Sequence, residues 1–183
     1  MVTRNSIAPF PADIDRDYFA AWLSGFVDGE GSFTLRQDYR SFKHTDKKFF
    51  VSSATFEITL RSDDLAILRT IQSFFGCGLI YRLIKPPKNY PNSKPRSTFK
   101  VSRVPQLAET IVPHFDASNL LAKKKNDYSI WREGVLLHRS ISKRKRVPLL
   151  GRSGTLPKWT AEESEQFAHF VRALKQKRIY VSP

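Results

Sequence analysis

Apolar residues recur at two different spacings in the first third of the chain. Between residues 15 and 28 they follow one another at steps of three and four, which predicts an amphipathic helix that stops at Gly29. Residues 31–42 and 49–60 alternate apolar with polar positions instead, which is typical of half-buried strands. The chain is therefore expected to open with a helix and a pair of strands.

The remaining sequence continues these two patterns. A helical stripe follows Ser62, which is expected to act as an N-cap, and it stops at Gly76. Later segments have the spacing of strands at 78–85 and 97–104, and of helices at 106–112, 119–138 and 160–176. The order of helices and strands predicts an α+β fold.

The same reading sets the expected domain boundaries. Residues 1–14 form an N-terminal tail, residues 15–138 a single domain, and residues 139–183 a basic arm and a C-terminal helix packed on that domain. No acidic residue occurs from position 134 to 161, where many Lys and Arg residues fall. This arm is either a solvated linker or a segment that contacts phosphates.

Basic residues outnumber acidic ones by a wide margin. The chain has 31 Lys and Arg against 17 Asp and Glu, a net charge of +14. Such an excess favours a polyanionic partner, with nucleic acid first and an anionic membrane surface second. No apolar run approaches the ~20 residues of a membrane span, and Cys77, the single cysteine, excludes an intrachain disulfide. We expect no membrane insertion, no small-molecule substrate and an inert Cys77 thiol.

The stretch WLSGFVDGEG at residues 22–31 is where chemistry is expected. Gly29 lies between two carboxylates, Asp28 and Glu30, so Glu30 is presented at a helix end where hard cations such as Mg²⁺ find oxygen ligands. A second helix packed on this one would bring two carboxylates together for phosphodiester cleavage. A plain helix-ending turn and a partial calcium loop are the alternatives. The small or polar residues expected on one face, where a second helix approaches, are Ala21, Ser24, Gly25 and Asp28.

Residues 23–31, LSGFVDGEG, resemble the LAGLIDADG motif of homing endonucleases. Residues 56–81 and 114–131 resemble later segments of the same family in the same order, so the resemblance covers roughly residues 16–138. It implies the αββαββα fold of that family, with a four-stranded antiparallel saddle that sits in the DNA major groove and motif helices at the dimer interface. One motif in the chain implies a homodimer that cuts a pseudo-palindromic site.

The resemblance also implies site residues. Glu30, with the main-chain oxygen of Gly29, is similar to the pair that binds the divalent metal, here expected to be Mg²⁺. Lys124 and Lys123 resemble a lysine that supports the reaction in relatives, with Lys125 as a third candidate. Leu60 stands where some relatives carry a polar Gln, a departure that makes Arg61 and Asp64 substitute candidates unless residues 62–64 are only a helix start.

The polar positions of the alternating strands are expected to face DNA together. Their donors, acceptors and methyl groups match the patterns of base edges in the major groove, and basic loop residues would contact phosphates. Arg82 falls on the core side of the alternation, so a bulge or a different register is possible there. The residues expected to bind DNA are Thr34, Arg36, Asp38, Arg40, Ser53, Thr55, Glu57, Thr59, Tyr81, Lys85, Thr98, Lys100, Lys143, Arg144, Lys145 and Arg146.

These observations lead to one expected function and two alternatives. We expect an intron-encoded, Mg²⁺-dependent, site-specific double-strand DNA endonuclease, located in a bacterial cytoplasm or an organelle matrix or stroma. An RNA maturase that assists group I intron splicing and a non-cleaving DNA-binding regulator on the same fold are the alternatives. A carboxylate at position 30 disfavours the regulator but leaves the maturase open.

Overall fold

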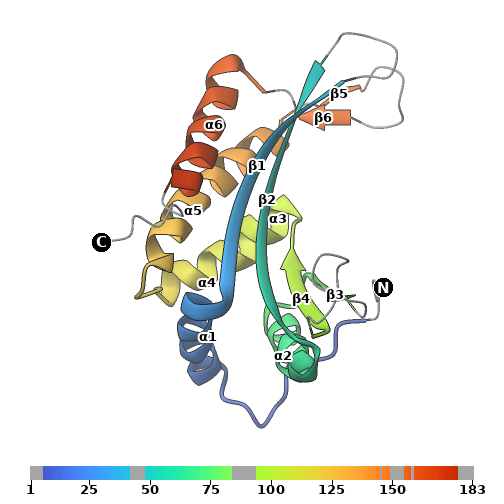
Figure 1. Cartoon of the computed structure of the whole chain (residues 1–183), viewed down its shortest axis with the longest axis vertical. Coiled ribbons are helices and arrows are strands. Elements are labelled where there is room, and N and C mark those ends of the chain that lie inside the picture. The colour runs from blue at the N-terminus through green and yellow to red at the C-terminus, as the bar shows by residue number, and fades with distance from the viewer. Residues whose placement is uncertain are drawn as a thin grey trace.

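A computed structural model of the chain describes residues 6–41, 48–83, 94–144, 146–148, 155–157 and 159–176. Its first part follows the predicted order closely (Figure 1). The elements there are helix α1 (Arg16–Glu30), strands β1 (Gly31–Ser41) and β2 (Lys48–Arg61), a 3₁₀ turn (Ser62–Asp64), helix α2 (Leu65–Phe75) and strands β3 (Leu79–Leu83) and β4 (Arg96–Val101). The predicted α+β order is confirmed.

The second part is helical, apart from one short hairpin. Two short helices joined by a π-helical turn (Leu107–Ile111) precede the long helix α5, and α6 closes the described chain. The elements are α3 (Val104–Gln106), α4 (Val112–Ala117), α5 (Lys124–Ser142), β5 (Arg146–Pro148), β6 (Thr155–Pro157) and α6 (Ala161–Gln176). No helix among the described residues is long and apolar enough to cross a membrane.

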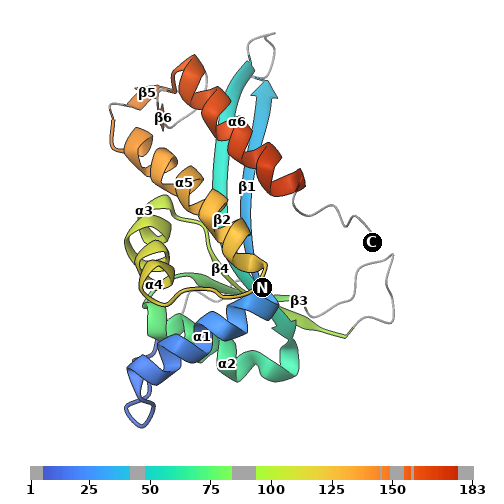
Figure 2. The same ribbon diagram turned by 90° about the vertical axis from the view of Figure 1, so that its left-hand side faces the viewer.

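Four strands form one antiparallel sheet with the order β1-β2-β4-β3. Figure 2 shows α5 and α6 running across the same face of the long β1 and β2 strands. The side chains that point to this face are buried, among them Phe33, Phe56 and Phe99. Trp131 of α5 packs against Phe33 with their rings 4.9 Å apart, which joins the helical layer to the sheet. The opposite face of the sheet carries the polar positions.

Helix ends follow the predictions only in part. Asp15 caps α1 by accepting the Tyr18 N–H, and α2 ends at Gly76 in the left-handed conformation, with φ 62°. However, α1 continues through Gly29 to Glu30, so the expected stop at Gly29 is wrong. The Ser62 side chain does not cap α2, because its hydroxyl bonds the Ser97 hydroxyl at 3.0 Å.

The C-terminal helix α6 shares the core of the sheet domain. Phe167, Val171 and Leu174 are buried in the same apolar cluster as the strands and α5. The reciprocal hydrogen bonds of a capping box open the helix, since the Thr160 N–H donates to Glu163 and the Glu163 N–H donates to the Thr160 hydroxyl.

Candidate active site and DNA-facing surface

Glu30 lies where α1 passes directly into β1. It is the last helical residue and is exposed, and Gly31 follows it as the C-cap with its N–H donating to the Val27 carbonyl. A Cβ atom on Gly31 would lie 2.4 Å from Val27 Cγ1, so this close turn requires glycine. The turn from helix to strand therefore fixes where the Glu30 carboxylate stands.

An open pocket of about 320 Å³ surrounds this carboxylate. Arg61 and Asp64, the substitutes proposed from the sequence, both line it. The other lining residues are Thr59, Leu60 and Arg96. Arg96 was missed at the sequence level, because only the pairing of β4 with β2 brings it beside Arg61.

Oxygen ligands for a cation are present at this junction. The carbonyls of the last helical turn have no later helical N–H to bind, and the Gly29 carbonyl is one of them. A carboxylate with a main-chain carbonyl suits Mg²⁺, which normally keeps water and substrate oxygens as further ligands. No group of three or more His, Cys, Asp or Glu side chains that could hold a metal occurs in the described part of the chain. A cation at Glu30 would therefore need main-chain carbonyl, water or substrate oxygens as further ligands.

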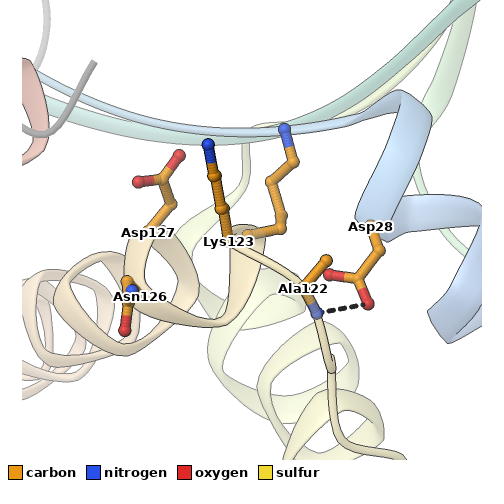
Figure 3. A pocket seen from close by; sticks show the side chains of 6 residues that line it. Asp28, Ala122, Lys123, Asn126 and Asp127 are labelled. Atoms are coloured by element: carbon orange, nitrogen blue, oxygen red, sulfur yellow. Dashed lines mark hydrogen bonds between the residues drawn. The ribbon is translucent and has the colours of Figure 1, made fainter. Parts of the chain in front are cut away.

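A second pocket, of about 780 Å³, lies between the end of α1 and the start of α5 (Figure 3). Lys123 and Lys124, the predicted lysines, line it together with Asp28 and Asp127. Lys123 is the residue before α5 and Lys124 its first residue, so the long helix starts five residues later than the predicted Asn119 and extends to Ser142. The lysines are thus held at a helix start, beside α1.

Asp28 binds the segment that precedes α5. Its Oδ2 atom accepts the N–H groups of Leu121 and Ala122 at 2.8 and 3.1 Å. One turn earlier, the Ser24 hydroxyl donates to the Ser118 carbonyl at 2.8 Å. One face of α1 therefore hydrogen-bonds residues 118–122, the segment that leads to Lys123 and Lys124.

The expected helix-pairing face is divided by this contact. Ser24 is buried, and with Asp28 it binds the chain's own segment 118–122 instead of standing free. Ala21 and Gly25 are exposed, and nothing lies within 4 Å of a Cβ built on Gly25 or Gly29. A second helix would find its closest approach along Ala21, Gly25 and Gly29.

The strand register puts the described strand residues that were predicted to bind DNA on one face of the sheet, opposite the helices. Thr34 pairs with Thr55 and Arg36 with Ser53, and across the next pair of strands Thr59 opposes Thr98. Alternation places the other described members on the same side. These are Asp38, Glu57, Tyr81 and Lys100, with Glu57 and Lys100 joined by a 2.6 Å ion pair.

Arg82 lies on the helix side, as the strand alternation indicated, in an unbroken β3–β4 register, so no bulge redirects it. Two of the predicted contact residues stand apart from the polar face. Arg144 forms an ion pair with Glu163 at 2.6 Å, and Lys143 is exposed at the end of α5. Lys85 and Lys145, and the side chains of Arg40 and Arg146, lie outside the described residues.

The chain thus combines a four-stranded antiparallel sheet, covered by helices on one face and polar on the other, with a carboxylate at a helix–strand junction. The family model described as LAGLIDADG endonuclease matches residues 23–135. The chain belongs to the LAGLIDADG endonuclease family.

Individual relatives agree with this assignment. The homing endonuclease I-ApeII of Aeropyrum pernix is 28% identical over 127 residues, which cover 67% of this chain and 66% of that protein. A Mycosarcoma maydis protein named "Probable intron-encoded DNA endonuclease 1" is 28% identical over 130 residues, 71% of this chain and 40% of that protein. The chain spans 23% to 66% of the length of the curated relatives it matches.

Solved structures share the fold. I-SmaMI bound to its DNA target with calcium ions superposes with a TM-score of 0.65 at 23% identity, over 86% of this chain and 45% of that chain. I-LtrWI bound to target DNA superposes with a TM-score of 0.65 at 18% identity, over 97% of this chain and 49% of that chain. The fold of this chain corresponds to roughly half of each of these longer chains.

Proposed function

We propose that this protein is a homing endonuclease that cleaves both strands of a specific DNA site. The observation that carries the proposal is the exposed Glu30 carboxylate at the junction of α1 and β1, beside a sheet face of polar and basic side chains. Such a face can enter a major groove, where Arg, Thr and Glu side chains distinguish base pairs. The names of the relatives support the same activity.

The proposed cofactor is Mg²⁺. Glu30 and the Gly29 carbonyl would hold it, and when bound it would supply charge stabilisation for phosphodiester hydrolysis. Lys124 and Lys123, at the start of α5, would bind and orient phosphate oxygens from the pocket beside the end of α1. Lys124 is the first choice, because its side chain is the more enclosed of the two.

Double-strand cleavage needs two such carboxylates. This chain carries one motif helix, and the solved relatives are about twice as long. We propose that two copies pair along Ala21, Gly25 and Gly29, so that each Glu30 serves one strand. A homodimer of this kind reads a pseudo-palindromic target, because its two reading faces are identical.

The test begins with selection of cleaved sites from a randomised DNA library in Mg²⁺. Glu30→Gln is then compared with wild type and with Glu165→Gln, an exposed carboxylate on α6. We expect Glu30→Gln to abolish cleavage of both strands while its affinity for the selected DNA in Ca²⁺ stays within about threefold, about 0.7 kcal/mol. Glu165→Gln should cut like wild type.

Four outcomes would contradict the proposal or a part of it. Cleavage by Glu30→Gln, or a loss of DNA affinity as severe as its loss of activity, would remove Glu30 from its role. A library that yields no cleaved product, with binding of structured intron RNA instead, would favour the maturase alternative. A selected site without two-fold symmetry would contradict the homodimer.

A further inference from the structure

Two arginines face each other at the end of the sheet closest to Glu30. Arg61 is the last residue of β2 and Arg96 the first of β4, and they are direct partners in the antiparallel register. Both line the pocket that contains Glu30. Their strand alternation continues that of Thr59 and Thr98, so both belong to the DNA-facing side.

Like charges directly opposite each other destabilise a sheet. Arg61 forms an ion pair with Asp63 at 2.6 Å, but both side chains are about 60% exposed (62% and 59%), so this ion pair offsets little of the repulsion. Arg96 forms no ion pair within the described part of the chain, and neither does Glu30. The pocket is thus lined by two guanidinium groups and by the carboxylates of Glu30 and Asp64, and neither carboxylate forms an ion pair with Arg96 in the described part of the chain.

The backbone beneath the two arginines is held firmly. The Thr59 and Thr98 hydroxyls bond each other at 2.8 Å, two residues along from the arginine pair. On the far side, the Ser62 N–H donates to the Pro95 carbonyl at 3.0 Å. The two backbone positions are thus held next to each other, so both guanidinium groups start from adjacent points at the same end of the sheet.

We propose that Arg61 and Arg96 form a phosphate-binding pair for the DNA strand that is cut at Glu30. A guanidinium presents paired N–H donors that match two phosphate oxygens, and a phosphate between the arginines would relieve their repulsion. Leu60, which replaces the polar residue of some relatives, packs against the core and supplies no donor. The two arginines place positive charge beside Glu30, where the negatively charged DNA phosphate would otherwise be repelled by the carboxylate. This inference rests on the proposed endonuclease function.

A first experiment tests phosphate binding without any cleavage. Thermal unfolding is measured for wild type, Arg96→Gln and Arg69→Gln in sodium phosphate and in sodium chloride of equal ionic strength. Arg69 is an exposed arginine on α2 without an ion pair among the described residues, so it matches the loss of charge. At phosphate about five times its Kd, we expect the midpoint of wild type and Arg69→Gln to rise by about 2–4 °C. The rise should be lost in Arg96→Gln.

A second experiment places the phosphate on the cut strand. Single-turnover cleavage of the selected DNA should fall about 100-fold in Arg96→Gln, the usual loss for one donor at a reacting centre. Arg61→Gln should act in the same direction, Arg96→Lys should recover part of the rate, and Arg69→Gln should leave the rate unchanged. The slope of log affinity against log salt should fall by about 0.9 for each phosphate that a variant no longer neutralises.

The outcomes separate this inference from the endonuclease proposal. If Arg96→Gln behaves like Arg69→Gln in phosphate, the pair does not bind phosphate and the inference fails even when wild type cuts DNA. If the phosphate effect is lost but cleavage is unchanged, the site does not hold the cut strand. A wild-type protein that cuts no DNA would overturn the endonuclease proposal, and the inference with it as regards the cut strand, while the phosphate titration would still report whether the pair binds phosphate.

Discussion

Asp28 is the residue whose role the structure changes most. From the sequence it is one of two carboxylates near a metal, or part of a helix-pairing face. In the fold its Oδ2 atom binds the N–H groups of Leu121 and Ala122, 93 and 94 positions later in the chain. Asp28 is therefore a positioning residue, which holds the turn that carries Lys123 and Lys124 against the motif helix.

Asp28→Ala removes the acceptor for both N–H groups. Hydrogen bonds to a charged acceptor contribute about 1.5–3 kcal/mol each, and partial exposure reduces this, so we expect the free energy of unfolding to fall by about 2–3 kcal/mol. Urea unfolding measures the change, and Asp28→Asn, which keeps an oxygen acceptor, should lose less. Asp13→Ala, an exposed carboxylate before α1, is the control. Equal stability of Asp28→Ala and Asp13→Ala would show that the hydrogen bonds that Leu121 and Ala122 donate to Asp28 do not stabilise the fold.

Gly31 is the second residue with a role set by close approach. A Cβ atom there would lie 2.4 Å from Val27 Cγ1 and 2.7 Å from the Val27 carbonyl oxygen. Gly31→Ala should therefore destabilise the fold by about 1–3 kcal/mol, as overpacking does, and should shift Glu30 with it. Gly29→Ala meets nothing within 4 Å in the single chain and should cause no loss of stability at low protein concentration. Thermal unfolding of the two variants gives the comparison, and a stable Gly31→Ala would contradict it.

At the scale of elements, the alternation of the strands was predictable and the long-range contacts were not. Phe33, Phe56 and Thr55 fall on their observed faces because the side-chain period of a strand is two, whatever lies around it. The start of α5 was misjudged by five residues, because Asp28 takes the N–H groups of a segment far along the chain. Arg96 was missed for the same reason, since positions 30, 61 and 96 meet only through strand pairing.

Helix α6 and helix α5 meet over a buried histidine. The His138 ring lies 5.5 Å from Trp159 and 6.0 Å from Phe167, and its Nε2 atom is 3.3 Å from the Ser52 hydroxyl of β2. Burial lowers the pKa of the His138 imidazole from 6.5 to about 4. The neutral ring is thus part of the contact between sheet, α5 and α6.

This histidine makes stability depend on pH. Between about pH 6.5 and pH 4 the unfolded chain binds a proton at His138 that the folded chain does not. The contribution of neutral His138 to the free energy of unfolding is therefore complete above pH 6.5. It is lost as pH falls toward 4, by up to about 3 kcal/mol. Urea unfolding across this range should show a smaller fall for His138→Gln than for wild type. His169→Gln, an exposed position on α6, should follow wild type; identical slopes for all three would contradict the prediction.

At the scale of the whole molecule, the chain carries one Glu30 carboxylate and corresponds to about half of each longer solved relative. Glu30 and the polar face of the sheet belong to one chain, and Ala21, Gly25 and Gly29 form an exposed stripe on α1. The packing of the described residues does not require Gly25 to lack a side chain, since no atom beyond the neighbouring helix backbone lies within 4 Å of a Cβ built there. In a helix interior glycine costs about 0.5–1 kcal/mol relative to alanine, and close packing of two motif helices in the proposed homodimer would offset that cost.

Gly25→Leu tests that contact directly. The leucine side chain has room in the single chain, so the free energy of unfolding at low protein concentration should not fall. It would hold two motif helices apart, and we expect sedimentation to shift from a dimer to a monomer and cleavage of the selected DNA to be abolished. Ser129→Leu adds the same side chain at an exposed position of α5 and should leave assembly unchanged. A Gly25→Leu protein that remains dimeric and cuts both strands would show that the two Glu30 carboxylates are brought together by another surface.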